Sequence, residues 1–352
     1  MSDNYHEDVH RQSTIKLRRR LRELPPFVQD FFRGVSDTTS IQTRIGYVYD
    51  LKIFFTFLSE ERVEMEGKAI DAFDPQDLQK ITVDAIEEFM EYLNYYIRNE
   101  KTKSLEFQNT EQGKSRKLSA VRTFLNYFYK KGDIVSNPAM LVDLPKLHEK
   151  SIIRLEVDEI ARLLDEAESG AHLSDRQKLY HQHTKTRDAA ILTLLLGTGM
   201  RVSECVGVNI SDVDFAVNGV KVTRKGGNET ILYFSGEVER ALRDYLETRL
   251  DEPARESDRA ALFLSLQNRR ISVRAVELLV KKYARLVNPL KKISPHKLRS
   301  TFGTQLYHET GDIYLVADVL GHADINTTIQ HYAAMDDEKR RSAARRVKLR
   351  EE

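Results

Sequence analysis

The sequence predicts a mainly α-helical protein with a small antiparallel sheet, built as two domains. Over most of the chain apolar residues recur every three or four positions, as they do along one face of a helix. Alternating apolar and polar residues, which are typical of strands, occur at 220–223 and 230–234, on either side of Gly226-Gly227. The stretch 144–151 is polar, contains a proline and separates two periodic patterns, so we expect it to link the domains.

The first half of the chain is expected to be all-helical. Residues 1–37 form an N-terminal extension, in which two short helices are joined by Pro25-Pro26. The domain at 38–143 follows, because its apolar spacing and its candidate N-cap residues predict further helices. We expect these helices to begin after the N-cap candidates at 38–40, at Val83, and after Ser115, with Gly132 closing the last one.

Basic residues of the helix after Ser115 are expected to lie on its outward face; they are Lys114, Arg116, Lys117 and Arg122. The run 114–131 has no acidic residue, and the runs 281–299 and 339–350 are similarly basic in a chain of net charge +1. A single run is usually a solvated helix face, but three of them favour a polyanion such as DNA as partner. The four residues are expected to contact DNA phosphates, since most protein–DNA hydrogen bonds go to the backbone.

The second domain, at 152–352, is expected to contain helices around the predicted hairpin. A helix over 156–168 precedes a polar, irregular segment at 169–186, and a buried helix at 189–196 ends at Gly197-Thr198-Gly199. The irregular segment carries His172, His181 and His183, but no Cys or carboxylate stands at ligand spacing, so we expect no metal site.

Composition argues against a disulfide-linked, a membrane-spanning or a secreted protein. The lone Cys205 cannot form an internal disulfide, and its apolar neighbours predict a small buried residue. The most apolar stretch, 189–200, is shorter than the roughly 20 residues that cross a bilayer. The acidic N-terminus lacks the apolar region of a secretory signal, so a cytoplasmic protein without membrane contact is expected.

Four short motifs of the second domain carry side chains suited to a phosphate diester. Tyrosine is a poor nucleophile at neutral pH, and nearby imidazole and cationic groups can take its proton and neutralise the charge of its target. Each motif alone can arise by chance, whereas all four in order are distinctive. They are Arg201 with Glu204 after the glycine break, Lys225 at the hairpin tip, His296 with Arg299, and His322 with Tyr332.

In this order the motifs resemble the tyrosine recombinases of the phage integrase family, which share their catalytic domain with the nicking–closing topoisomerases. The resemblance covers residues from about 38 to 340. It implies a core-binding, SAM-like DNA clamp at 38–143 and a tyrosine-recombinase catalytic domain at 152–352. The segment 11–36 and the insertion at 169–186 make the chain most similar to the Xer type, specifically the single-recombinase XerS branch of Gram-positive bacteria.

The resemblance implies which groups make and break bonds. Tyr332 attacks the scissile phosphate, which leaves a 3′-phosphotyrosyl link and a free 5′-hydroxyl. Lys225 protonates the departing 5′-oxygen, and His296 is the acid/base partner of the tyrosine proton. If the hairpin register differs, Lys221 or Arg224 replaces Lys225 in this role.

The resemblance also implies how the transition state is stabilised. Arg201, Arg299 and His322 contact the non-bridging oxygens, a task for which guanidinium groups suit because they stay charged and present forked donors. Glu204 orients Arg201 or a histidine. Since the phosphotyrosyl link preserves the energy of the phosphodiester, no cofactor, ATP or metal is implied.

Some positions depart from the family pattern or stand outside it. Ser300 follows Arg299 where a second histidine is usual, and Asn228 and Thr230 stand where basic residues are common. His308 and His331 are outside the motifs and are expected to be surface or packing residues.

The resemblance implies double-stranded DNA as substrate and a homotetramer on two DNA sites, acting through Holliday junctions. A C-terminal helix at about 336–352 would dock on a neighbouring protomer, with a DNA-binding tail as the alternative. The favoured role is resolution of chromosome dimers at a dif-like site in the nucleoid, with a cell-division DNA translocase as a partner. An integrase of a mobile element is the runner-up. A catalytically idle DNA-binding regulator is the rival class, and Tyr332 argues against it.

Overall fold

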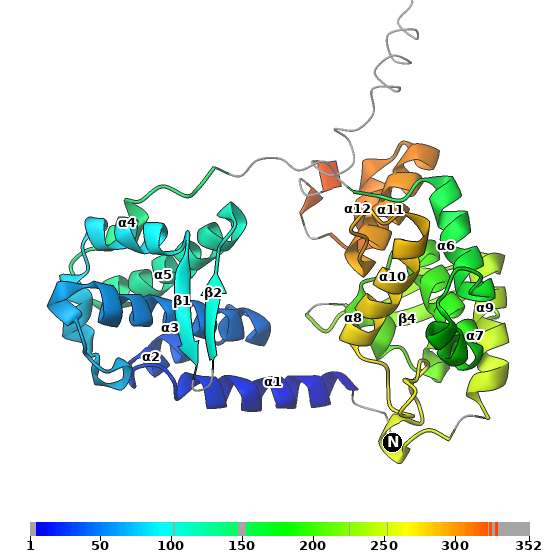
Figure 1. The fold of residues 1–352 in the computed structure, drawn as a ribbon, viewed down its shortest axis with the longest axis horizontal. Coiled ribbons are helices and arrows are strands. Elements are labelled where there is room, and N and C mark those ends of the chain that lie inside the picture. The colour runs from blue at the N-terminus through cyan, green and yellow to red at the C-terminus, as the bar shows by residue number, and fades with distance from the viewer. Residues whose placement is uncertain are drawn as a thin grey trace, which may run out of the picture. The chain divides into compact units, whose positions relative to one another are not determined.

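The computed structural model describes residues 5–100, 103–146, 153–224, 226–251, 253–322, 324–325 and 328–329. They form two compact units, divided between residue 150 and residue 151 (Figure 1). Helices dominate both units and each contains one small antiparallel sheet, which confirms the predicted mainly α class. Within these ranges, none of the helices has the length and apolar character needed to cross a bilayer.

The described ranges of the first unit form five helices, a hairpin and short 3-10 turns. In chain order they are α1 (Tyr5–Leu21), α2 (Val28–Gly34), α3 (Ile41–Glu61), η1 (Val63–Met65), η2 (Ile70–Ala72), η3 (Pro75–Lys80), α4 (Val83–Tyr92), β1 (Tyr96–Glu100), β2 (Lys103–Phe107), α5 (Glu111–Lys131) and η4 (Pro138–Met140).

Side-chain caps set where the long helices of this unit begin. The Ser40 hydroxyl accepts a hydrogen bond from the Thr43 N–H at 3.1 Å, so α3 begins where the sequence predicted. The prediction of Ser115 as the cap of α5 is wrong, because the Thr110 hydroxyl accepts from the Gly113 N–H and the helix begins at Glu111. Gly132 ends α5 in the left-handed conformation, as predicted.

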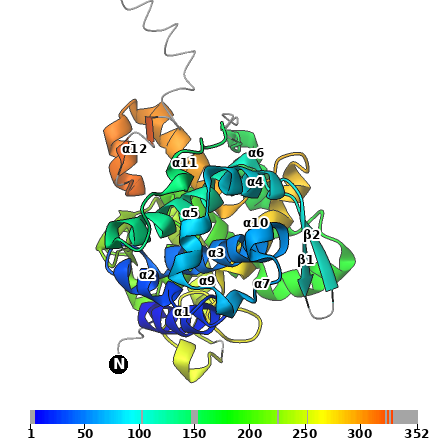
Figure 2. The same ribbon diagram turned by 90° about the vertical axis from the view of Figure 1, so that its left-hand side faces the viewer.

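The hairpin β1–β2 contradicts the prediction that this half is all-helical. The strands pair in antiparallel register with Tyr96 opposite Phe107. The Tyr96 ring stacks on Phe107 and on Tyr92, at centroid distances of 5.3 and 5.1 Å. Figure 2, in which this unit faces the viewer, shows the paired strands at the edge of its helices. The stacked rings therefore tie the hairpin to α4.

An aromatic core holds the helices of the first unit together. Phe31, Phe55, Phe124 and Phe128 are fully buried. The Phe124 ring meets Phe31 and Phe55 edge to face, at 5.4 and 5.8 Å. Such geometry suits the ring quadrupole, and each buried ring stabilises the fold by about 1.5–3 kcal/mol. Since Phe31 belongs to α2, which lies within the predicted N-terminal extension, that extension shares the core of this unit.

The basic residues of α5 do not all face outward. The Arg116 side chain is 57% exposed and pairs with the buried carboxylate of Asp50. Lys117 is only 6% exposed and donates to Asn109 at 2.6 Å, and burial lowers its pKa. The outward-face prediction is therefore right for Arg116 and wrong for Lys117.

The other two basic residues of α5 are half-buried and have partners within the unit. Lys114 donates to the side-chain oxygen of Asn94 at 3.0 Å. The Arg122 guanidinium donates to the backbone oxygens of Ala139, at 2.8 Å, and of Val142. Arg122 thereby fastens η4 and the segment after it to α5.

In the residues that the structure describes, the second unit contains seven helices and a three-stranded sheet. In chain order they are α6 (Val157–Ser169), α7 (Asp175–Thr198), α8 (Val202–Gly207), η5 (Ile210–Asp212), β3 (Val213–Asp214), β4 (Gly219–Thr223), β5 (Glu229–Tyr233), α9 (Gly236–Arg249), η6 (Glu256–Asp258), α10 (Val273–Val287), α11 (Pro295–Thr310) and α12 (Ile313–Leu320).

Helix α7 is longer than the sequence predicted. It begins at Asp175, where Ser174 and Gln177 form a capping box, so the expected irregular segment is wrong from residue 175 onward. His181 is buried, with Nε2 2.8 Å from the backbone oxygen of Ala167, and so ties α7 to α6. The apolar second half of α7 is buried as predicted.

The predicted hairpin is confirmed as β4–β5, in register from Gly219 opposite Tyr233 to Thr223 opposite Glu229. A short third strand, β3, pairs with β4. The turn between β4 and β5 is closed by hydrogen bonds between Arg224 N–H and the Asn228 oxygen, at 2.8 Å, and between Gly227 N–H and the Arg224 oxygen, at 3.0 Å.

A buried carboxylate anchors the segment that leads into α11. Glu159 of α6 accepts hydrogen bonds from the Lys291 ammonium at 2.6 Å, from the Asn288 amide at 2.8 Å, and from the Glu156 backbone N–H at 2.8 Å. Burial raises the pKa of Glu159, but these hydrogen bonds outweigh it and lower the pKa to about 2.

Glu159→Gln is expected to lower the free energy of unfolding by about 2–3 kcal/mol at pH 7. A carboxyl with a lowered folded-state pKa stabilises the fold above its ordinary pKa of 4.5, and this contribution is lost as the pH falls towards 2. Urea unfolding at several pH values, followed by circular dichroism, measures the effect. Glu168→Gln, at an exposed position of the same helix, is the control. An equal loss at pH 7 and pH 2 would contradict this account.

Arg122→Ala is expected to speed hydrogen exchange in peptides covering residues 138–142, because two backbone oxygens lose their donor. The free energy of unfolding should fall by about 1–3 kcal/mol. Arg33→Ala, which removes only an exposed pair with Asp30, should change it by less than about 0.5 kcal/mol. Unchanged exchange near η4 would show that Arg122 does not fasten this segment.

Candidate active site

The carboxyl end of α12 is the centre of the candidate site. The last carbonyls of a helix have no partner within it, and the helix dipole makes this end partially negative. Gly321 ends α12 in the left-handed conformation, with φ +62°, which turns the chain directly into His322. Cationic side chains from three other segments donate to this helix end.

Arg299 is the most deeply placed of these cations. It lies one turn into α11, is buried, and donates to the backbone oxygens of Leu320 and, at 2.8 Å, of Gly199. Helices α11 and α12 lie side by side (Figure 1). The guanidinium therefore joins the end of α7 to the end of α12.

Gly199 permits this close approach of three helices. It ends α7 with φ +64°, and an added Cβ would overlap the Phe302 ring and lie 3.0 Å from Leu320. The chain can then turn at once towards Arg201. This explains in physical terms why a glycine break precedes the arginine.

Arg201 stands at the N-cap of α8 and reaches the same helix end. Its Nη2 donates to the Gly321 oxygen at 3.1 Å, and its Nη1 donates to Glu204 at 2.9 Å. Glu204 is buried and also accepts from the Arg201 backbone N–H at 2.8 Å. One carboxylate thus fixes both the backbone and the side chain of Arg201.

His322 follows Gly321 directly. Its backbone N–H donates to the Ala317 oxygen at 2.9 Å, and its Nδ1 lies 2.7 Å from the hydroxyl of the fully buried Thr328. A hydrogen bond at one ring nitrogen fixes the plane of the imidazole, so the ring is oriented before any substrate binds. The sequence motifs did not indicate the role of Thr328.

The structure describes some of the remaining predicted residues and not others. His296 is exposed at the start of α11, one turn before Arg299. Ser300 bonds back to the His296 backbone oxygen at 3.1 Å. Lys225, His331 and Tyr332 lie outside the described residues, as does the predicted C-terminal helix.

Arg224, which precedes Lys225, is a further cation at the end of α12. The sequence motifs did not predict this location. Its Nη2 donates to the Val319 oxygen at 2.8 Å and its Nη1 to the Asp318 oxygen at 3.3 Å. Four consecutive carbonyls, from Asp318 to Gly321, therefore each accept from a guanidinium. The site collects Arg201, Arg224, Arg299 and His322 around one helix end, an arrangement suited to a phosphate group.

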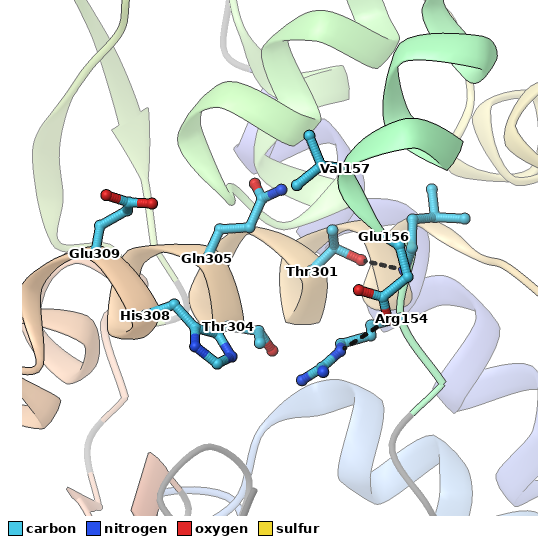
Figure 3. A pocket seen from close by; sticks show the side chains of 9 residues that line it. Arg154, Glu156, Val157, Thr301, Thr304, Gln305, His308 and Glu309 are labelled. Atoms are coloured by element: carbon cyan, nitrogen blue, oxygen red, sulfur yellow. Dashed lines mark hydrogen bonds and ion pairs between the residues drawn. The ribbon is translucent and has the colours of Figure 1, made fainter. Parts of the chain in front are cut away.

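Helix α11 borders a groove with another of its faces. Figure 3 shows Thr301, Thr304, Gln305 and His308 following one another along the helix, with Arg154 across the groove. The Leu155 N–H donates to the Thr301 hydroxyl at 3.1 Å and closes one end of the groove. His308 is exposed there, as expected for a residue outside the motifs.

Comparisons with known proteins agree with this arrangement. The family model described as "Phage integrase family" matches residues 154–339. The tyrosine recombinase XerC of Caldanaerobacter subterraneus subsp. tengcongensis is 34% identical over 340 residues, which are 93% of this chain and 88% of that protein.

Two solved structures share the fold. The Tn1549 transposon integrase (residues 82–397) in complex with circular intermediate DNA superposes with a TM-score of 0.64 at 17% identity, over 91% of this chain and 99% of the other. The XerH site-specific recombinase bound to a palindromic difH substrate gives 0.62 at 18% identity, over 86% and 78%.

Gly321→Ala is expected to lower the free energy of unfolding by about 2–4 kcal/mol. The left-handed conformation costs an alanine about 1–2 kcal/mol, and its methyl group would overlap the Arg224 guanidinium. Adding Arg224→Ala should therefore cost less in this background than in the wild type. Additive losses would contradict the overlap.

Gly132→Ala is the matched control for this cycle, with urea unfolding as the measurement. Gly132 has φ +85° and no atom within 4 Å of an added Cβ, so only the backbone cost of about 1–2 kcal/mol should appear.

Proposed function

The chain belongs to the phage integrase family of tyrosine recombinases, and on that basis we propose that it is a site-specific recombinase that cleaves and rejoins double-stranded DNA. The observation that carries the proposal is the meeting of Arg201, Arg299 and His322 at the carboxyl end of α12. They come from three segments of the chain and supply several N–H donors at one place, as recognition of a phosphate requires.

Strand cleavage in the proposed reaction is a transesterification. The oxygen of Tyr332 forms a bond to phosphorus as the bond between phosphorus and the 5′-oxygen breaks. The tyrosine proton passes to His296, and the 5′-oxygen takes a proton from the Lys225 ammonium, so that atoms and charge balance. Attack by another 5′-hydroxyl on the 3′-phosphotyrosyl link reverses these steps and joins new partners through a Holliday junction.

The described part of the site supplies charge stabilisation. Negative charge develops on the non-bridging oxygens as phosphorus becomes pentavalent, and forked guanidinium donors match that geometry. Arg201 and Arg299 are already held by backbone oxygens and by Glu204, so little reorganisation is required when the phosphate arrives. We assign Glu204 the role of orienting Arg201.

The first unit is proposed to bind the duplex around residues 38–143, with residues 144–151 as the linker. Of the four basic residues of α5, Arg116 has the exposure that suits a phosphate contact. Lys114 contributes beside it. Lys117 and Arg122 donate to groups within the unit, so we propose that they affect DNA binding only indirectly, by stabilising α5.

We further propose the Xer-type role: resolution of chromosome dimers at a dif-like site, in the XerS branch of the family. The relatives named XerC and the XerH–difH complex support the Xer type, whereas the choice of the XerS branch rests on the sequence resemblance. The proposal includes a tetramer on two sites, docking of residues 336–352 on a neighbouring protomer, a location at the nucleoid in the cytoplasm, and a cell-division DNA translocase as partner.

A nicked suicide duplex carrying the chromosomal dif-like sequence tests the reaction. The wild type should form a covalent protein–DNA adduct that survives a denaturing gel, and Tyr332→Phe should bind the duplex without forming the adduct. Tyr307→Phe, a tyrosine of α11 outside the motifs, should form it normally. Specific binding by the wild type with no adduct would contradict the catalytic proposal.

A further inference from the structure

Arg224 holds the turn between β4 and β5 against α12. Its guanidinium is half-buried and donates to two carbonyls of the last turn of α12, those of Val319 and Asp318, at 2.8 and 3.3 Å. These contacts join residues 94 and 95 positions apart in the chain. A guanidinium can serve two adjacent carbonyls at once because its N–H donors form a fixed fork.

Within the part of the turn that the structure describes, the two glycines have open space around them. Gly226 and Gly227 both have positive φ, and an added Cβ at either would meet nothing within 4 Å. Two backbone hydrogen bonds close the turn on itself, between Arg224 and Asn228 and between Gly227 and Arg224. Without a contact to α12, a glycine turn of this kind keeps much of its conformational freedom.

Gly321 leaves the space that the Arg224 guanidinium occupies. Only a residue without a Cβ leaves room for the Arg224 guanidinium at the helix end, since a Cβ there would overlap Nη1 and Cζ. The same glycine turns the chain into His322, and its oxygen receives Arg201. One position therefore accommodates both the hairpin turn and a phosphate-binding arginine.

We infer that Arg224 is a positioning residue for strand cleavage: it holds the base of the turn that carries Lys225 against the end of α12, where Arg201 and Arg299 also donate. The inference rests on the proposed role of Lys225 as the acid for the 5′-oxygen. Arg224 is unsuited to be that acid itself, because a guanidinium keeps its proton at any ordinary pH and this one is engaged by carbonyls. Lys221 is less suited, since it pairs with Glu229 at 3.4 Å on the strand.

A substrate with sulfur in place of the bridging 5′-oxygen separates positioning of an acid from general damage to the site. A thiolate leaves without a proton, because the pKa of an alkyl thiol is about 8.5 and far below that of an alcohol. Single-turnover cleavage of oxygen and sulfur suicide duplexes is measured for the wild type, Arg224→Ala, Arg224→Lys and Lys225→Ala. Arg274→Ala, an exposed arginine on α10, is the matched control.

Arg224→Ala should cleave the oxygen substrate at least about tenfold more slowly, as a part of the 10²–10⁴-fold contribution of a general acid, and the sulfur substrate at the wild-type rate. Arg224→Lys should fall between Ala and the wild type, because an ammonium retains the charge but lacks the fork. Arg274→Ala should match the wild type on both.

Equal slowing of Arg224→Ala on both substrates would overturn the inference in favour of a structural or phosphate-binding role. Wild-type rates on both would overturn it as well. Lys225→Ala reports on the underlying proposal: if sulfur does not restore its rate, the acid role of Lys225 fails and the inference falls with it. If the sulfur substrate restores the cleavage rate of Lys225→Ala but not that of Arg224→Ala, only the inference about Arg224 fails.

Discussion

The hydrogen bonds between guanidinium groups and the last carbonyls of α12 are the interaction on which the second unit depends. Carbonyls left without a partner at a partly buried helix end would be costly, and arginines from α8, α11 and the β4–β5 turn donate to them. Three like charges at one place repel one another. The negative end of the helix dipole and the buried carboxylate of Glu204 offset that repulsion. The same contacts that complete the fold therefore collect the cations that a phosphate needs.

Much of this arrangement could be predicted from the sequence, because it follows from motifs whose residues are fixed by chemistry. Arg201, Arg299 and His322 were identified by their types and order, and the structure brings them to one helix end. The hairpin followed from alternating residues around two glycines. In both cases the signal is local, and a single chain contains all of it.

Other features depend on tertiary packing and could not be predicted in the same way. Lys117 is buried because Asn109, from the segment after β2, receives its ammonium, and helix spacing does not indicate that partner. The hairpin β1–β2 is tied to α4 by ring stacking, which a search for helical periodicity overlooks. Thr110 caps α5 although Ser115 has the same chemistry. The sequence offers Arg224 only as a substitute acid, since nothing in it indicates that the guanidinium reaches a helix 94 residues away.

The arginines that donate to the end of α12 are held in a way that suits the charge-stabilising role proposed for them. Arg201 and Arg299 extend from helices and bind backbone oxygens on rigid elements, as stabilisation of developing charge requires, because a preorganised donor need not move when the charge appears. A proton donor must instead follow a leaving oxygen that departs from phosphorus. A glycine turn allows such movement, but its freedom lowers the fraction of time spent near the oxygen. The Arg224 contact at the base of the turn restrains the strand end, and the two glycines beyond it keep a wide choice of backbone conformations. The helix end that orders the arginines thereby also limits the reach of the turn.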